Sequence, residues 1–516
     1  MRSATRRLAF GAMKPADETR QWFVSATAGL VLLWGAALLD GRSGLVSASA
    51  LLGLCITFLV LTSLTLGTTR SALALLVVAS LINRYAVTLG GLHLKPETVA
   101  VPLVGLVVVG ELAAHRRLPR LTLVDWLLGA WIVANGLGSL YAPLRGTSLK
   151  LTVQLALLCA GSLAIRQLIR NGVDLRVALA VMLGGLTVVA AIGVVAYVLY
   201  PLGPNLGIQI DPITHRPTAY ATLFEGNLFG SSIMVGWFWW LVALLTGTSR
   251  RWLAVLGLAI TTAGVEVSLA RGTWLAIAVT LLVAGIVLLA NRPRSMISLS
   301  PHAADLGLAA FTALVLSAIV LLSPGSLVVQ ALHRPAVVGN TTTAGAARGG
   351  TVGSQSASPA IIQRATTLSE PGADATVTQR LEIVRSAVRD WRVHPLTGLG
   401  PGSYGESHID TSHQPAWIGI LPVRILHDTG ILGTVVFLAF GVVLARRWLA
   451  ALRACAVAWL RAALIAQGLG LIALAIAYTA TEGLELLFAW VVLGLLVATI
   501  EVAQPGVTDS PATAYT

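Results

Sequence analysis

Apolar runs of about twenty residues recur along nearly the whole chain, and they restrict its fold more than any other feature. A helix that crosses a bilayer needs about 20 predominantly apolar residues. Only 11% of the 516 residues are charged, against about 25% in a soluble domain. We therefore predict an all-α polytopic membrane protein with twelve to fourteen transmembrane helices. The candidate helices are 21–40, 45–67, 71–89, 97–114, 122–141, 150–168, 175–200, 227–247, 252–270, 272–291, 304–324, 430–445, 462–480 and 484–502.

The arginines predict how the chain is oriented in the membrane. Basic residues are concentrated in alternate loops, and the loops between them carry only scattered charges. Because basic loops stay on the cytoplasmic side, we expect both termini to be cytoplasmic. The net charge of +13 then follows from membrane orientation and does not indicate nucleic-acid binding. The basic loops are 113–120, 166–176, 248–251, 291–295 and 445–453.

This orientation divides the chain into five segments. Within the long outer loop, 335–372 is small, polar and glycine-rich, which is typical of a flexible segment. Apolar residues at helical spacing over 375–392 predict an amphipathic helix that lies on the membrane surface or caps the bundle. The segments are a cytoplasmic tail 1–20, a bundle of about eleven helices 21–324, an extracytoplasmic loop 325–429, three final helices 430–502 and a cytoplasmic tail 503–516.

Three arginines on the predicted outer side are candidates for binding a phosphate group. They are Arg216, Arg271 and Arg424. A planar guanidinium binds phosphate oxygens in a bidentate way, so three of them near one surface could hold a diphosphate. The alternative for each is an arginine at the membrane interface that reaches toward water.

Four of the nine histidines fall in the long outer loop or at its end: His394, His408, His413 and His427. Such a cluster favours a general base, whereas a single histidine is more often a structural hydrogen-bonding residue. Glu225 is a further candidate base. The histidines and the three cysteines lack metal-ligand spacing, and no phosphate-binding loop or dinucleotide motif is present in the sequence. We therefore predict no metal and no cofactor.

Several of these segments resemble one family. The stretch "RLEIVRSAVRDW" followed by "HPLTGLGPGSYG" resembles the segment before the final helices of the O-antigen ligase/polymerase superfamily. "HDTGILGTVVFLAF" resembles that family's re-entry into the membrane, and "SLARGTWLA" resembles its Ser-Arg-Gly hairpin. "RPTAYATLFEGNLFG" is similar to its Arg, Phe, Asn and Gly segment. The similarity extends over roughly residues 200–450.

The resemblance implies a GT-C-like, metal-independent, inverting glycosyltransferase in the bacterial cytoplasmic membrane. Such an enzyme moves a glycan from an undecaprenyl-diphosphate carrier to an acceptor hydroxyl, on a glycan or a lipid, at the outer surface. In this interpretation Arg216, Arg271 and Arg424 bind the diphosphate, and the base is His413, His427 or Glu225. The amphipathic helix and the glycine-rich loop after it form a lid and acceptor groove, with Arg380, Arg385 and Tyr404 as candidate residues.

One position departs from the family pattern. Counting back from Gly430 and Gly433 puts Gly419 where the ligases have histidine, and His413 lies six residues upstream of that position. A polysaccharide polymerase of the same superfamily therefore remains an alternative to a ligase. A polytopic transporter or flippase is a second alternative, and a non-catalytic assembly protein is a third.

Overall fold

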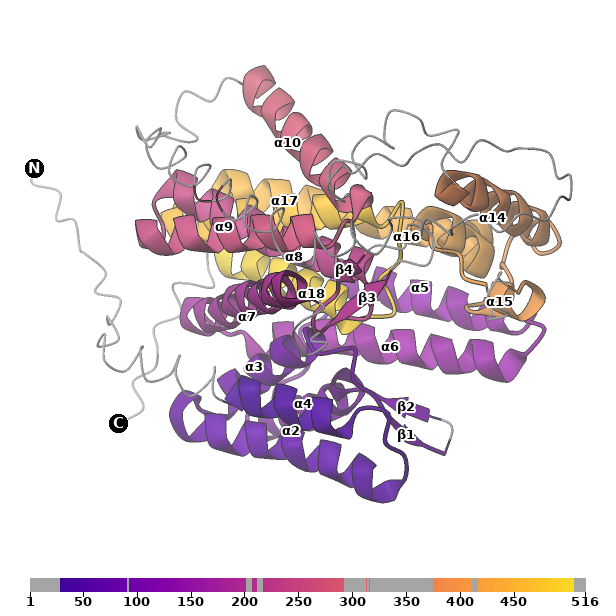
Figure 1. Cartoon of the computed structure of the whole chain (residues 1–516), viewed down its shortest axis with the longest axis horizontal. Helices are drawn as coiled ribbons and strands as arrows, with labels where there is room; N and C mark the ends of the chain where they lie inside the picture. The colour runs from indigo at the N-terminus through magenta and orange to yellow at the C-terminus, as the bar shows by residue number, and fades with distance from the viewer. Residues whose placement is uncertain are drawn as a thin grey trace, which may run out of the picture.

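The computed structural model describes residues 28–90, 92–200, 207–210, 217–291, 312, 315, 375–409 and 416–504. Helices make up most of this part of the chain, and most of them run side by side along one axis (Figure 1). Seven are long and apolar enough to cross a membrane: α2 (Leu45–Leu66), α4 (Pro96–Ala114), α6 (Arg145–Leu168), α7 (Gly172–Leu199), α8 (Gly226–Thr246), α16 (Leu421–Ala454) and α17 (Ala458–Ala477).

Further helices pack against these seven. Two antiparallel hairpins, β1 (Val87–Leu89) with β2 (Leu92–Leu94) and β3 (Ile208–Ile210) with β4 (Pro217–Ala219), are the strands that the structure describes. The shorter helices are Ala28–Leu39, α3 (Thr68–Ser80), α5 (Leu123–Ser139), α9 (Arg251–Val267), α10 (Arg271–Asn291), α14 (Ala375–Trp391), α15 (Ser403–Ser407) and α18 (Leu487–Ala503).

The expected apolar runs agree with these helices in most places. Every run except 304–324 overlaps a named helix; only residues 312 and 315 of that run are described, and 1–20, 335–372 and 505–516 lie outside the described residues. Two boundaries differ from expectation. The run 71–89 is helical only to Ser80 and continues into the hairpin strand β1. Helix α16 begins at Leu421, nine residues before the expected start at 430, so the end of the predicted outer loop is helical.

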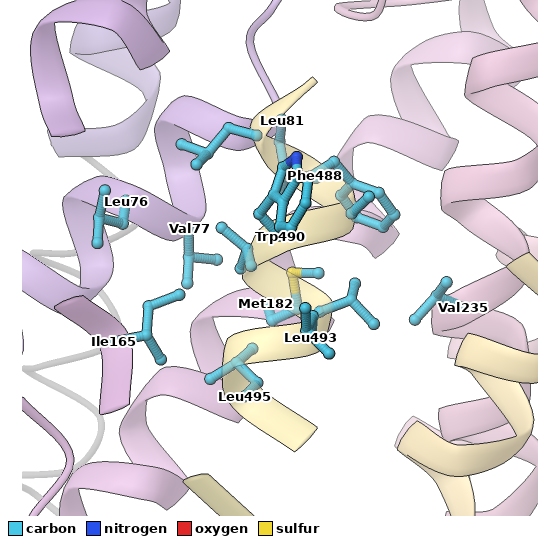
Figure 2. Packing of buried hydrophobic residues seen from close by; sticks show 14 of the residues in the cluster. Leu76, Val77, Leu81, Ile165, Met182, Val235, Phe488, Trp490, Leu493 and Leu495 are labelled. Carbon is cyan, nitrogen blue, oxygen red and sulfur yellow. The ribbon is translucent and has the colours of Figure 1, made fainter. Parts of the chain in front are cut away.

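Helix α18 lies at the centre of the bundle. Every residue from Leu487 to Ile500 is buried, which is expected of a helix that is hydrophobic on all sides. Figure 2 shows Trp490 and Leu493 of α18 among side chains of neighbouring helices, including Val77 of α3 and Met182 of α7. The main core is therefore built around α18, with α6, α16 and α17 also against it.

Two of the basic loops that we expected on one side of the membrane, 113–120 and 166–176, meet at one end of the bundle. Arg120 donates to the carbonyl oxygen of Arg166 at 2.7 Å, which joins the loop before α5 to the end of α6. Arg170 pairs with Glu111 at 2.8 Å, and the Arg176 guanidinium lies 4.3 Å from the ring centre of Trp459. Helices α5 (Leu123–Ser139) and α7 (Gly172–Leu199) therefore both begin at this end, as the alternation of basic loops predicts.

The predicted amphipathic helix exists as α14, and it caps the bundle. It lies with α15 beside the first part of α16, at the end of the molecule where the β1–β2 hairpin also lies (Figure 1). The side of α14 that packs on the bundle does not include all of its apolar residues. Ala387 is buried and Ile383 packs in the same cluster, whereas Leu381 is 51% exposed.

Candidate functional site

The glycine-rich stretch after α14 fits into a break in helix α16. Gly430 has φ 61° and ψ −164°, a conformation that interrupts the helix and that only glycine adopts easily. Above the break, the carbonyl oxygens of His427 and Asp428 accept hydrogen bonds of 2.9 Å from the amides of Leu399 and Gly400. The residues 395–400 therefore replace helical hydrogen bonds that the break removes.

The same loop also satisfies the lower side of the break. The amides of Ile431 and Leu432 donate to the carbonyl oxygens of Pro395 and Leu396 at 2.9 and 3.1 Å. The fit is close, because a Cβ atom on Gly398 would lie 2.5 Å from the carbonyl carbon of Asp428. A broken helix is tolerated inside a membrane protein where other groups satisfy its freed backbone. This loop does so with four hydrogen bonds.

The break holds a histidine and an aspartate in contact. Nδ1 of His427 lies 2.9 Å from Oδ1 of Asp428, and the histidine is 1% exposed. Nε2 of His427 is buried and has no hydrogen-bond partner among the described residues. A carboxylate that accepts from Nδ1–H fixes the tautomer in which Nε2 carries the lone pair. This pair has the arrangement of a general base and the group that orients it.

Arg424 lies one turn before this pair and is surrounded by carboxylates. Its Nε donates to Oδ2 of Asp428 at 3.0 Å, and its two terminal nitrogens pair with Glu482 and Glu485. The guanidinium also lies 4.7 Å from the ring centre of Trp417. Arg424 is only 7% exposed, and a buried charge requires such partners. Its three nitrogens are thus all engaged by acidic groups, one of which also holds His427.

A second polar cluster lies at the beginnings of α8 and α10. A cavity of about 20 Å³ is lined there by Asn227 of α8, Thr273 of α10, Arg380 of α14 and Thr481. Both α8 and α10 start beside this cavity, so the positive ends of their dipoles lie near it. An arginine, two threonine hydroxyls and two helix N-termini give this cavity a positive lining that can donate hydrogen bonds, around a space of about one water molecule.

Glu225, the residue before α8, belongs to this second cluster. Its Oε1 accepts a hydrogen bond of 3.3 Å from the hydroxyl of Thr481. Burial raises the pKa of the Glu225 carboxyl, while hydrogen bonds from Thr481 and Asn227 and the charge of Arg380 act in the opposite direction. The carboxyl therefore holds a proton more readily than an exposed glutamate does.

The turn between α17 and α18 joins the two clusters. Thr481 lines the cavity beside α8 and α10, and the next residue, Glu482, pairs with Arg424. The cavity at the beginnings of α8 and α10 and the His427–Asp428 pair thus lie on either side of one short turn.

An apolar cavity of about 300 Å³ also reaches this region. It lies between α16, α17 and α18, and its lining includes Phe440, Leu444, Trp448, Leu471 and Leu493. Leu421 and Leu484 line it as well, and both also line a smaller cavity that contacts Arg424, Asp428 and Glu482. A hydrocarbon chain in the larger cavity would therefore end next to the buried ionic network.

The predicted site residues separate into four groups, of which the fourth is the cap over α16. Arg216 and His413 lie outside the described residues. His427 and Arg424 are in the ionic network, and Glu225, Arg380 and the start of α10 at Arg271 are at the second cluster. Arg424 and Arg380 line separate cavities.

Tyr404 and Arg385, expected in a lid, both belong to the cap over α16. The hydroxyl of Tyr404 lies 2.7 Å from the hydroxyl of Ser386, and its ring meets that of His427 edge to face at 5.7 Å. Its other face stacks on His408 at 4.2 Å. Arg385 is exposed on the outer surface of α14. Tyr404 therefore covers the histidine, and Arg385 lies away from it.

Sequence reasoning missed the role of Asp428, which contacts both Arg424 and His427. The spacing of Arg424 and Asp428, four residues apart on a helix, is a signal that predicts such a pair. The contacts with Glu482 and Glu485 leave no such local signal. Comparison with protein-family models and with curated proteins finds no match to this chain.

Proposed function

We propose that this chain is a metal-independent, inverting glycosyltransferase of the O-antigen ligase/polymerase type. It moves a glycan from an undecaprenyl-diphosphate carrier to an acceptor hydroxyl, on a glycan or a lipid, at the outer side of the bacterial cytoplasmic membrane. The observation that carries the proposal is the His427–Asp428 pair at a helix break, in which the buried Nε2 of His427 has no hydrogen-bond partner among the described residues. Both termini are cytoplasmic in this orientation.

The reaction needs a base, a site for the leaving diphosphate and room for a lipid chain. The acceptor oxygen attacks the anomeric carbon, its proton passes to Nε2 of His427, and the bond from the anomeric carbon to the diphosphate oxygen breaks. Asp428 orients the imidazole and stabilises the imidazolium that forms. Arg424 acts as a positioning residue through Asp428, because all three of its nitrogens are already engaged.

Arg380, Arg271 and the N-termini of α8 and α10 would receive the departing diphosphate. Charge that is fixed in place before the reaction stabilises a leaving group most effectively. The apolar cavity between α16, α17 and α18 would hold part of the isoprenoid chain. Since Tyr404 and α14 cover His427, the acceptor enters when this cap moves, which is a common gating step.

The test is transfer by the purified chain in proteoliposomes that contain an undecaprenyl-diphosphate-linked glycan and an acceptor. His427→Gln should lower the rate about 10²–10⁴-fold, the usual contribution of a general base. His394→Gln is the matched control, because His394 stacks on Tyr141 at 4.5 Å, outside the ionic network. Equal rates for the two variants would exclude His427 as the base.

In cells lacking the chain, accumulated lipid-linked polymer identifies a ligase, and single lipid-linked repeat units identify a polymerase.

One observation favours a second candidate, an ion-coupled transporter or flippase. Asp428 and His427 lie buried at a broken helix, next to buried Glu482 and partly buried Glu485, and such groups inside membranes often carry ions or protons. A transporter moves its lipid or solute across sealed vesicles without an acceptor, and an imposed proton gradient changes the rate. Movement without an acceptor, together with no glycan transfer, would favour this function over the transferase.

A further inference from the structure

Helix α14 has one face that no described part of the bundle covers. Its docked face carries Ala387, which is buried against Tyr404 and Ile418. On the other side of the helix, Arg385, Arg389 and Arg392 are all exposed. Their spacing of four and then three residues places them in one row.

The arginine row lines a concave surface. With Val384 and Val388 it encloses an open cavity of about 430 Å³. None of the three arginines makes an ion pair with a residue that the structure describes. Arg166 and Arg424, by contrast, are each matched by at least two acidic groups. The row is thus positive charge that the described fold does not neutralise.

Apolar side chains follow this row along its length. Leu381 is 51% exposed, and Val384 and Val388 are only partly buried. A water-soluble polyanion would neutralise the arginines and leave these side chains in water. A phosphorylated lipid would satisfy both strips, with its phosphate on the guanidinium groups and its hydrocarbon on the valines and leucine.

We propose that the exposed face of α14 binds the phosphate headgroup of an anionic membrane lipid. Arg385, Arg389 and Arg392 contact the phosphate oxygens, and Leu381, Val384 and Val388 contact the first part of the acyl chain. This site is separate from the His427–Asp428 pair, and it does not depend on glycan transfer. Bound lipid would hold α14 on the membrane at the end of the bundle where it caps α16.

The experiment measures lipid binding to the full chain in neutral detergent by native mass spectrometry, with phosphatidylglycerol and phosphatidylcholine as the two lipids. Phosphatidylglycerol should bind more tightly. R385Q/R389Q/R392Q should weaken that binding about 100-fold, since each basic residue near an anionic surface contributes about a fivefold factor. V384S/V388S should weaken it several-fold while leaving the charge unchanged.

The control removes the same charge from scattered positions at the same end of the bundle. R42Q/R145Q/K150Q changes three exposed cations that lie outside α14, and it should leave phosphatidylglycerol binding within about twofold. Equal weakening by both triple variants would overturn the proposal, as would no weakening by the α14 variant.

Two further ligands identify the source of the recognised group. Glycerol 1-phosphate should compete only at concentrations far above those of the lipid, because it lacks the chain that the valines contact. If it competes as well as the lipid, the site binds free phosphate esters and the lipid proposal is wrong. Tighter binding of polygalacturonate, insensitive to V384S/V388S, would assign the face to an acidic glycan instead.

Discussion

Replacing Gly398 with alanine should loosen the loop that fills the break in α16. Gly398 has a φ of +70°, and an added Cβ would lie 2.5 Å from the carbonyl carbon of Asp428. If the loop stays docked, the left-handed backbone alone costs about 1–2 kcal/mol for a residue with a Cβ, and the close contact adds to it. If the loop detaches, four backbone hydrogen bonds are lost, at about 1 kcal/mol each. The expected loss of unfolding free energy is therefore about 2–5 kcal/mol.

The assay measures unfolding of the purified chain in detergent, induced by heating or by denaturant. Gly129→Ala in α5 is the control, because an added Cβ there meets no atom within 4 Å. Alanine in a helix interior should leave stability unchanged or raise it by up to about 1 kcal/mol. Gly398→Ala should also lower any transfer activity, since the loop bonds directly to the backbone of His427 and Asp428. The reasoning fails if the two variants unfold at the same midpoint.

Three further predictions test buried charges. Arg424→Met leaves Asp428, Glu482 and Glu485 without their cation and should destabilise the fold by about 3–5 kcal/mol; thermal unfolding measures this, and a loss below 1 kcal/mol would mean that the network is open to water. Glu97→Ala removes the acceptor for the Leu487 amide at 3.0 Å and should cost about 1–3 kcal/mol, whereas Glu97→Gln keeps an acceptor oxygen and should cost less. Burial raises the pKa of Glu225 in the folded chain above its value in the unfolded chain. The free energy of unfolding should therefore fall as the pH rises from the unfolded-state pKa to the folded-state pKa of this carboxyl. Glu225→Gln should abolish this fall in unfolding midpoints measured from pH 4 to 8, and an unchanged profile would contradict it.

The sequence predicts the helices of this fold well because a bilayer imposes a simple requirement of length and polarity. It also predicts α14, whose apolar residues recur at helical spacing. Which side of α14 packs against the bundle does not follow from that spacing. Ala387, a small residue with little weight in an apolar pattern, lies at the contact because it lets α14 approach closely, and the larger Leu381 stays outside.

The site was less accessible to sequence reasoning. Glycines are common in membrane helices, so nothing distinguishes Gly430 at a helix break from Gly129 inside a regular helix. The pairing of Arg424 with Glu485 joins positions 61 residues apart, and the cavity at α8 and α10 also draws Arg380 from a distant helix. Such contacts follow from the packing of the bundle, and a single sequence carries no record of them. Residue types could be proposed from the chain alone, but their partners could not.

The central position of α18 has a consequence for how the protein is made. The ribosome delivers α3, α6 and α7 to the membrane long before α18, yet all three pack against it. Until residues 487–503 emerge, the faces of these earlier helices that α18 covers lack that partner. The amide of Leu487 then reaches Glu97, a partner translated 390 residues earlier. Insertion of α18 is thus the step that converts a loose set of inserted helices into a closed bundle, and a nascent chain stopped before Leu487 should remain open to proteases and membrane quality control.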